Sequence, residues 1–323
     1  MLSANATAAP VTQFIITGFD HLSNQKLLGS LILIAYFIAL LGSTTNLVII
    51  VTSRQLHTPM YILICNLAVV DIMFTTSAST TMISVLLTEI KSISYYSCFS
   101  RMYVYHLGGL TECLALSLMA VDRMVAISLP LRYHSILTVP RILLLIAFTW
   151  LIGILAMAAV AVIANNLPYC QPVIRYVFCD YPAMVRAACT DPEPAFVVPV
   201  ILNLWLLAGQ LPFILLTYMK IVYTVVRMPK GQMKTESQNA MFTTCVSHVT
   251  AVFCYYAPKL VSNLLTRVGV VLTLTERNAL LIVATLVPPL LNPIVYCLKT
   301  KEIRIRLKNV LLNLRVSQVQ QNS

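Results

Sequence analysis

AVDRMVAISLPLRY occupies residues 120–133 and ends a run of apolar residues that begins near Cys98. Within this stretch, Asp122 and Arg123 place an acid and a fixed cation side by side. Charged side chains are costly inside a bilayer, and those that occur there pair with one another and mark functional positions. We therefore expect a charged pair at a membrane boundary, where it can act as a latch.

The composition of the whole chain indicates a membrane protein. Of its 323 residues, 59% are hydrophobic and only 10% are charged, which is far too apolar for a soluble globular domain of this length. Segments long enough to cross a bilayer, about 20 apolar residues each, recur along the chain. They cover residues 27–52, 60–87, 98–122, 141–164, 196–226, 238–266 and 277–298. The sequence therefore predicts an all-α membrane protein, a bundle of seven transmembrane helices.

The net charge of +11 invites a nucleic-acid-binding function, but its distribution argues against one. With these seven spans, 14 of the 22 Lys and Arg residues fall on one side of the membrane, seven fall on the other, and Lys259 lies within a span. Cytoplasmic loops carry the excess of Lys and Arg in membrane proteins. This rule places the N-terminal segment 1–26 outside the cell and segment 299–323 inside, with the transmembrane domain 27–298 between them.

The outer segments carry two kinds of covalent-modification signal. Asn5 begins the sequon Asn-Ala-Thr, which is an N-glycosylation acceptor when it lies outside the cell. Four cysteines fall on the outside or at its edge, namely Cys98, Cys170, Cys179 and Cys189. An even number in an oxidising compartment predicts two disulfide bonds, and the sequence alone leaves three pairings open.

Two carboxylic acids are expected at one depth in neighbouring helices. Asp71 lies 11 residues into the second span and Glu112 lies 11 residues before Arg123, so both sit about 16 Å from the cytoplasmic edge at 1.5 Å per residue. Unpaired acids are costly there, so the pair is protonated, shares a proton or holds a cation. A protonated pair hydrogen-bonded to nearby Ser and Asn side chains is the alternative to a cation site.

Three basic or imidazole side chains are expected in the outer half of the bundle. Lys259 follows Pro258 well within the sixth span, and Arg267 lies about 12 Å further out along the helix axis. His106 lies eight residues after Cys98, about 12 Å inside the outer end of the third span. An ammonium group inside a span, such as that of Lys259, must face an acid or a wet cavity. For Arg267 alone, a role in ligand binding and a solvated or snorkelling charge at the helix end are equally good interpretations.

The fifth and seventh spans add polar and helix-bending residues. The fifth span carries Asn203 and ends near Tyr218, while Asn292 and Pro293 in the seventh span allow that helix to bend and rotate. Residues 299–314 then alternate basic and apolar side chains at helical spacing. Such a pattern predicts a short amphipathic eighth helix that contacts anionic lipids of the inner leaflet.

Four motifs stand in order along the chain, each in the loop or span where one receptor family has it. They are LHTPMY (56–61), PLRY (130–133), TCVSH (244–248) and PPLLNPIVY (288–296). Each alone would be a weak signal, but jointly they are specific. With them the chain resembles, over nearly its whole length, the odorant receptors among the rhodopsin-like (class A) G-protein-coupled receptors. The ending LKTKEIR and His106 resemble the class I, fish-like subset.

The resemblance implies a receptor of the plasma membrane, with its N-terminus extracellular, that binds a small odorant. Its expected partner is a heterotrimeric G protein of the stimulatory, olfactory type. The family pattern pairs Cys98 with Cys179 and leaves Cys170 for Cys189. No cofactor is implied apart from an allosteric sodium ion at Asp71 and Glu112, because class A receptors commonly bind sodium at an Asp in the second span and odorant receptors commonly add a Glu in the third.

The resemblance also implies how the switch works. In the resting state Arg123 pairs with Asp122, and in the active state Arg123 is freed as the sixth helix moves outward and opens a crevice for the G protein. The residues expected to take part are Asp122, Arg123, Tyr218, Asn292, Pro293 and Tyr296.

The expected ligand is a small anion. Class I receptors that recognise carboxylic acids use a His and an Arg at positions matching His106 and Arg267, whereas Lys259 replaces the usual apolar residue. The resemblance therefore implies a carboxylate held by Arg267 through a bidentate pair. Lys259 either adds a second anionic subsite or replaces Arg267 as the anchor, and Asn203 completes the expected set of ligand-binding residues.

A transporter or channel is the alternative from another class of protein, since it would also use acids within the membrane. Transporters usually show internal repeats and broken half-helices, and the sequence has neither. An enzyme is disfavoured because the chain contains no HExxH motif, no nucleophile elbow and no cluster of metal ligands of the catalytic type. A ligand-activated receptor therefore fits the sequence better than a transporter, a channel or an enzyme.

Overall fold

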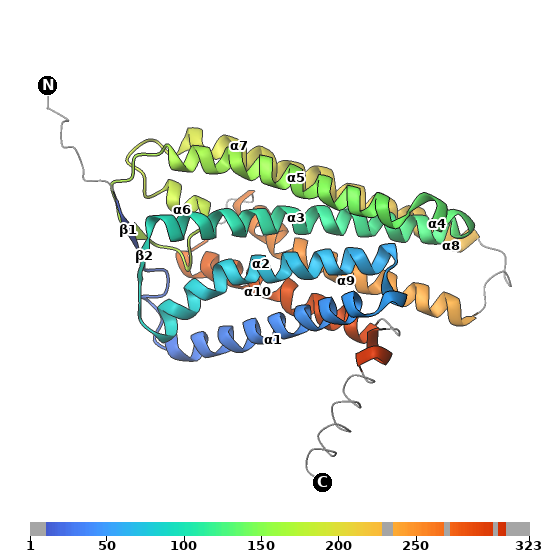
Figure 1. Ribbon diagram of the computed structural model, residues 1–323. Helices are drawn as coiled ribbons and strands as arrows, with labels where there is room; N and C mark the ends of the chain where they lie inside the picture. The colour runs from blue at the N-terminus through green and yellow to red at the C-terminus, as the bar shows by residue number, and fades with distance from the viewer. Residues whose placement is uncertain (1–10, 228–234, 268–271, 300–302, 308–323) are drawn as a thin grey trace, which may run out of the picture.

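The computed structural model describes residues 11–227, 235–267, 272–299 and 303–307, and within these the side chains of 235–242, 262–263, 266–267 and 297–299 are not described. In this part of the chain, long helices run side by side and form one elongated bundle (Figure 1). In chain order they are α1 (Gln25–Thr52), α2 (Pro59–Leu87), α3 (Tyr95–Ser128), α5 (Val139–Asn165), the continuous stretch α7 (Glu193–Leu204), η3 (Trp205–Gln210) and α8 (Leu211–Arg227), then α9 (Thr235–Arg267) and α10 (Leu274–Lys299).

These helices confirm the seven predicted spans, and every end but one lies within three residues of its predicted position. Five of the described helices are long and apolar enough to cross a membrane, and α3 qualifies together with the bent segment that follows it. The fifth span contains a π-helical stretch, η3, which the sequence did not predict. Short helices η1 (Arg54–Leu56), η2 (Pro130–Arg132), α4 (Tyr133–Ile136) and α6 (Tyr181–Val185) lie in the connections.

The end of α3 differs from the prediction. Residue 122 was expected to be the last of the third span, but the helix continues to Ser128. It stops just before Leu129 and Pro130, since the residue before a proline is disfavoured in helical conformation. Asp122 and Arg123 therefore lie more than one turn inside the helix rather than at its end.

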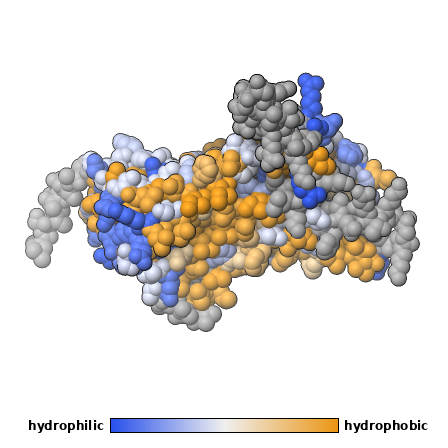
Figure 2. Space-filling view, turned by 90° about the horizontal axis from the view of Figure 1, so that it is seen from below, coloured by the Kyte–Doolittle hydropathy of each residue, from blue (hydrophilic) through white to orange (hydrophobic). Residues whose placement is uncertain are grey.

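The outward-facing side chains of the bundle are apolar. Phe37 of α1, Leu144 of α5 and Leu216 of α8 expose 64%, 70% and 59% of their surface. Figure 2 shows a broad hydrophobic band across the middle of one face, with hydrophilic residues beyond it. Such a band would be unfavourable in water, at about 25 cal/mol per Å² of apolar surface, but it suits the hydrocarbon layer of a bilayer. The multi-pass membrane assignment thus rests on both sequence and structure.

Glycines let neighbouring helices approach closely. A Cβ atom at Gly42 of α1 would lie 2.7 Å from Cβ of Pro293 in α10, and one at Gly108 of α3 would lie 2.9 Å from Cβ of Phe74 in α2. Small residues at such contacts are the usual means of packing transmembrane helices, because helix association there depends on close van der Waals contact. The positions of the second, third and seventh spans are set in part by these contacts.

A small sheet, absent from the all-α prediction, closes the outer end of the bundle. Strand β1 (Gln13–Ile16) pairs antiparallel with β2 (Ser92–Ser94) and parallel with β3 (Val173–Ile174). Phe14 and Ile16 point inward and are fully buried, whereas the alternate residues of β1 are exposed. The N-terminal segment is therefore part of the outer cap.

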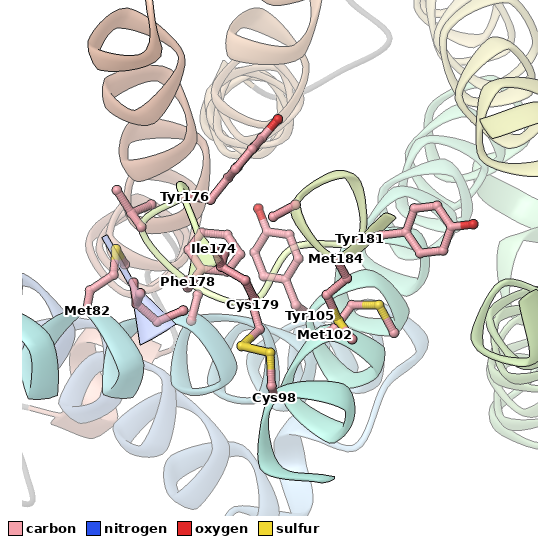
Figure 3. Packing of buried hydrophobic residues seen from close by; sticks show 14 of the residues in the cluster. Met82, Cys98, Met102, Tyr105, Ile174, Tyr176, Phe178, Cys179, Tyr181 and Met184 are labelled. Carbon is pink, nitrogen blue, oxygen red and sulfur yellow. A yellow bond between two sulfur atoms is a disulfide. The ribbon is translucent and has the colours of Figure 1, made fainter. Parts of the chain in front are cut away.

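Two disulfide bonds hold this cap, and both expected pairings are confirmed. Cys98 bonds Cys179 and Cys170 bonds Cys189, with Cα–Cα distances of 5.4 and 5.3 Å, within the usual range. Around the first bond, buried side chains of α2, α3 and the outer loop meet in one cluster (Figure 3). The loop from residue 166 to 192 is thus fixed onto the top of α3.

We expect Gly108→Ala to destabilise the receptor more than Gly109→Ala does. The new methyl group at Gly108 would overlap Phe74, and overpacking of this kind costs about 1–3 kcal/mol. At Gly109 the added Cβ would lie 3.5 Å from the Phe74 ring, an ordinary contact, so that variant keeps the gain in helix propensity of about 1 kcal/mol. Thermal unfolding in detergent measures the difference in Tm between the two variants, and we expect Gly108→Ala to be lower by at least about 2 °C. Equal Tm values, or a lower Tm for Gly109→Ala, would contradict this prediction.

Candidate functional site

The end of α3 that is predicted to face the cytoplasm carries an ion pair. Arg123 donates through Nε to Oδ2 of Asp122 at 2.9 Å, and its Nη2 pairs with the same oxygen. Both side chains are largely buried, with exposed fractions of 12% and 1%. Nη1 of Arg123 also lies 3.5 Å from Oγ1 of Thr244 in α9. In this structure Arg123 is therefore held by its neighbouring acid and touches the sixth span.

Tyr133, which sequence reasoning had noted only within the PLRY motif, is a third member of this latch. Its hydroxyl donates to Oδ1 of Asp122 at 2.7 Å. Burial, together with the nearby Asp122 carboxylate, raises the pKa of Tyr133, so the phenol stays protonated and remains a donor. Asp122 thus has one oxygen on Arg123 and the other on Tyr133.

The expected active-state partners of Arg123 are engaged elsewhere. The hydroxyl of Tyr218 lies 2.6 Å from Nδ1 of His248, and Nε2 of that ring lies 3.0 Å from the carbonyl of Leu116. A carbonyl only accepts, so Nε2 carries the proton and Nδ1 accepts from Tyr218. Tyr296 donates to Sδ of Met119 at 3.9 Å. Both tyrosines would have to exchange partners to reach Arg123.

A cavity of about 20 Å³ lies beside Arg123 and Tyr296. It is bounded by side chains of α2, α3, α9 and α10, namely Met60, Leu63, Ile64, Met119, Asp122, Arg123, Thr244, Ser247, His248 and Tyr296. A space of this size holds about one water molecule. Three of the expected switch residues, Asp122, Arg123 and Tyr296, therefore face the same small cavity.

The two acids expected at one depth are brought together in the middle of the bundle. Nδ2 of Asn292 lies 3.1 and 3.3 Å from the two carboxylate oxygens of Asp71 and 3.5 Å from Oε1 of Glu112. All three side chains are buried. Oε2 of Glu112 and Oδ1 of Asn292 have no hydrogen-bond partner. Since unpaired buried acceptors are unfavourable, these oxygens fit a small cation, and the donor set is of the hard-oxygen type that such a cation prefers.

Lys259 lies close to this acid pair. Its Nζ is 3.4 Å from the centre of the Tyr255 ring. The hydroxyl of Tyr255 donates to the carbonyl of Gly109 in α3 at 2.5 Å. Lys259 therefore packs against an aromatic ring that reaches α3 about one helical turn from Glu112.

His106 contacts the outer loop. Its Nε2 lies 2.9 Å from Oδ1 of Asp180 and 3.3 Å from the backbone nitrogen of Tyr181. Asp180, which sequence reasoning missed, is only 6% exposed. The signal was available in the expected Cys98–Cys179 bond, because that bond brings the next residue of the loop to α3, two turns from His106.

For the remaining predicted site residues the structure gives the position in the chain but few side-chain contacts. Asn203 lies in α7, one residue before its end, and has an interaction partner. Arg267 is the last residue of α9, and its side chain lies outside the described residues, as does Asn5. The eighth helix expected after residue 299 is described only at residues 303–307, which are helical.

Known proteins match both this fold and this sequence. The crystal structure of squid rhodopsin superimposes with a TM-score of 0.71 over 90% of this chain and 86% of its own, at 18% identity. The bundle is thus a rhodopsin-like receptor fold. A family model described as olfactory receptor matches residues 32–314. Human Olfactory receptor 10G4 is 35% identical over 93% of this chain and 94% of its own length, and human Olfactory receptor 10G7 is 35% identical over 95% and 97%.

The chain belongs to the olfactory receptor family. It is a G-protein-coupled receptor for a small molecule and not an enzyme. Membership of this family also excludes the alternative function as a transporter or channel. The match is to the family as a whole, so membership of the class I subset stays a prediction.

We expect Tyr133→Phe to raise ligand-free signalling several-fold. The change removes one hydrogen bond to the Asp122 carboxylate, worth about 1.5–3 kcal/mol for a charged acceptor, and so weakens the group that holds Arg123. Ligand-free G-protein activation, normalised to receptor at the cell surface, measures the effect. Ser135→Ala is the control, because the exposed Ser135 hydroxyl donates to the backbone carbonyl of Arg132 and not to the latch. Identical ligand-free activity in both variants would refute the role of Tyr133.

Proposed function

We propose that this odorant receptor binds a small, carboxylate-bearing anion and activates a stimulatory, olfactory-type G protein. The observation that carries the proposal is the position of Lys259 against the Tyr255 ring, whose hydroxyl contacts α3 about one turn from Glu112. The N-terminus is placed outside the cell, which the distribution of Lys and Arg supports. The cap with its two disulfide bonds then lies on the oxidising side.

The donors of Lys259 allow an anionic ligand to bind beside it. An ammonium group has three donors and no acceptor, so it can serve Glu112 and a second carboxylate together. A ligand carboxylate at this position would compete with Glu112 for the ammonium group. Binding would thereby change the contact between α9, which carries Lys259, and α3, which carries Glu112.

The height of the site along α3 favours a short ligand. His106 lies three residues above Gly109, the residue that Tyr255 contacts, and six residues above Glu112, which corresponds to about 5 and 9 Å along the helix. A ligand of a few carbon atoms would reach from Lys259 to the His106–Asp180 pair. Arg267 lies about 12 Å further out on α9 than Lys259 and in this proposal holds a second acid group of dicarboxylates or amino acids, or captures the ligand first. Asn203 of α7 provides an amide on the fifth span.

The same helix connects the ligand to the latch. Lys259 lies in the outer half of α9, and in its inner half Thr244 touches Arg123 while His248 bonds α3. Pro258 removes a backbone hydrogen bond between the two halves and allows a bend there. A shift of Lys259 away from Glu112 would therefore move α9 relative to α3 and release Arg123 to bind the G protein with Tyr218 and Tyr296.

We expect Lys259→Met and Arg267→Ala each to lower potency toward carboxylic acids by well over tenfold. Each removes a charged donor of the expected anion site, while Met keeps most of the length of Lys. A cyclic-AMP reporter in cells, challenged with short mono- and dicarboxylic acids, amino acids and the matching aldehydes, measures the effect. Surface expression is recorded in parallel.

Lys26→Met is the matched control for the loss of a lysine, since Lys26 is 77% exposed at the outer end of α1. It should respond to acids as the parent does. Full acid responses in both site variants, or a parent that answers only neutral odorants, would rule out the anionic ligand. A parent that responds without a rise in cyclic AMP would rule out the stimulatory G protein.

A sodium ion at Asp71 and Glu112 is the second part of the proposal. Lys259 supplies one positive charge to a group with two carboxylates, and a sodium ion would supply the other. The unpaired oxygens of Glu112 and Asn292 support it. Because the ion would hold α2, α3 and α10 together in their present arrangement, it would favour the resting state.

Raising external sodium at constant ionic strength should therefore lower ligand-free cyclic-AMP production in the parent. The Asp71→Asn, Glu112→Gln double variant, which keeps hydrogen-bonding amides but removes both charges, should not respond to sodium. Choline as the replacement cation controls for ionic strength. Equal sodium sensitivity in parent and variant would eliminate this site in favour of a protonated acid pair.

A further inference from the structure

Two arginines converge on one phenol at the outer end of the bundle. Nη1 of Arg277, in the first turn of α10, donates to the Tyr176 hydroxyl at 3.0 Å, and Nη1 of Arg186, just after α6, donates to the same oxygen. Each guanidinium carbon lies 5.9 Å from the centre of the Tyr176 ring. Figure 3 shows the Tyr176 side chain pointing away from the Cys98–Cys179 disulfide. The two guanidinium nitrogens are at most about 6 Å apart, because both lie within hydrogen-bond distance of one oxygen.

This arrangement leaves two positive charges without a negative partner. A phenol is neutral and accepts at most two hydrogen bonds, so Tyr176 is saturated and compensates neither charge. Within the described part of the chain, no ion pair joins Arg186 or Arg277 to an acid. Four of the described acids at this end contact other side chains: Asp20 contacts Lys91, Glu89 contacts Lys26, Asp180 contacts His106 and Glu276 contacts Thr273. Asp191 accepts from the backbone nitrogen of Glu193, and neither of these two acids forms an ion pair with a described residue.

The backbone around the pair is fixed. A Cβ atom at Gly18 would lie 2.3 Å from the carbonyl carbon of Tyr176, so the N-terminal segment packs directly against the loop there. Asn278, next to Arg277, donates to the carbonyl of Gly18 at 3.1 Å. Tyr176, Arg277 and the N-terminal segment are thus held together before any ligand arrives, which limits the entropy lost on binding.

We propose that Arg186 and Arg277 form an oxyanion site at the extracellular end of the receptor, which binds a carboxylate or phosphate group. Each guanidinium retains N–H donors beyond the one bonded to Tyr176, in the planar fork that matches two oxygens of such a group. The bound anion bridges the outer loop to α10. The site uses none of the residues of the Lys259 pocket and does not rest on the proposed ligand.

Inorganic phosphate is the probe for this site. The purified full-length receptor in nanodiscs of neutral phosphatidylcholine is titrated with phosphate against chloride, at constant pH, sodium concentration and ionic strength, and Tm is recorded. The parent should gain about 2–5 °C with saturation, as a ligand of the folded state does. Acetate should act in the same sense, and neutral acetamide should have no effect.

The Arg186→Gln, Arg277→Gln double variant should lose the phosphate effect. Arg175→Gln, which removes an exposed charge from the same loop, should keep it, and so should Lys259→Met. Should the double variant fold poorly, Arg277→Lys keeps the charge but loses the planar fork, and its half-effect phosphate concentration should rise at least fivefold. The proposal is overturned if the parent gains no stability, if the double variant gains as much as the parent, or if Arg277→Lys is unchanged.

A second set of nanodiscs containing anionic phosphatidylserine identifies the source of the anion. A lipid headgroup at the site raises the starting Tm of the parent but not of the double variant, and it reduces the further gain from phosphate. A soluble anion leaves the starting Tm unchanged and the phosphate effect intact. Either result supports the oxyanion site, whereas an equal rise in parent and double variant counts against it.

Discussion

One side-chain amide, that of Asn292, joins three helices in the middle of the bundle. Its Nδ2 contacts Asp71 of α2 and Glu112 of α3 from α10. In hydrocarbon each of these groups would be unfavourable alone. Their mutual contact is therefore the constraint on which the relative positions of these three helices depend.

The two ends of the bundle are held by contacts of different strength. Two disulfide bonds, a three-stranded sheet and a large buried cluster fix the outer end. The opposite end also has a buried cluster, but it has no disulfide bond among the described residues. The ion pair there depends on one acid, Asp122, which is shared between Arg123 and Tyr133 beside a cavity of about one water. Since packed cores respond to a small change by adopting another discrete arrangement, the weaker end is the one suited to change.

Much of this fold could be predicted from the sequence because the bilayer imposes length and apolarity on each span. The helix ends followed the apolar runs, and the depth of Asp71 and Glu112 followed from the rise per residue. The Asp122–Arg123 contact was expected because the two residues are neighbours in the sequence. The disulfide pairings needed the family pattern, since spacing alone left three choices.

Contacts between residues far apart in the sequence could not be predicted. Strand β1 is four residues long and gains its partners from positions about 80 and 160 residues away, so no local pattern marks it. The convergence of Arg186 and Arg277 on Tyr176 likewise depends on how the outer loop folds back, whereas the contact of His106 with Asp180 could have been inferred from the expected Cys98–Cys179 bond. The extension of α3 to Ser128 was missed because the charges at 122 and 123 were taken as the end of the span.

The place of β1 in the cap constrains the order in which the receptor is assembled. This strand is the first described element to be synthesised, yet it lies between β2 and β3 and needs both for its hydrogen bonds. Residues 173 and 174 emerge only after α1, α2, α3 and α5 have been made. The N-terminal segment must therefore wait outside the membrane, with Phe14 and Ile16 uncovered, until four spans are inserted. The cap can therefore be complete only when the first half of the bundle is in place.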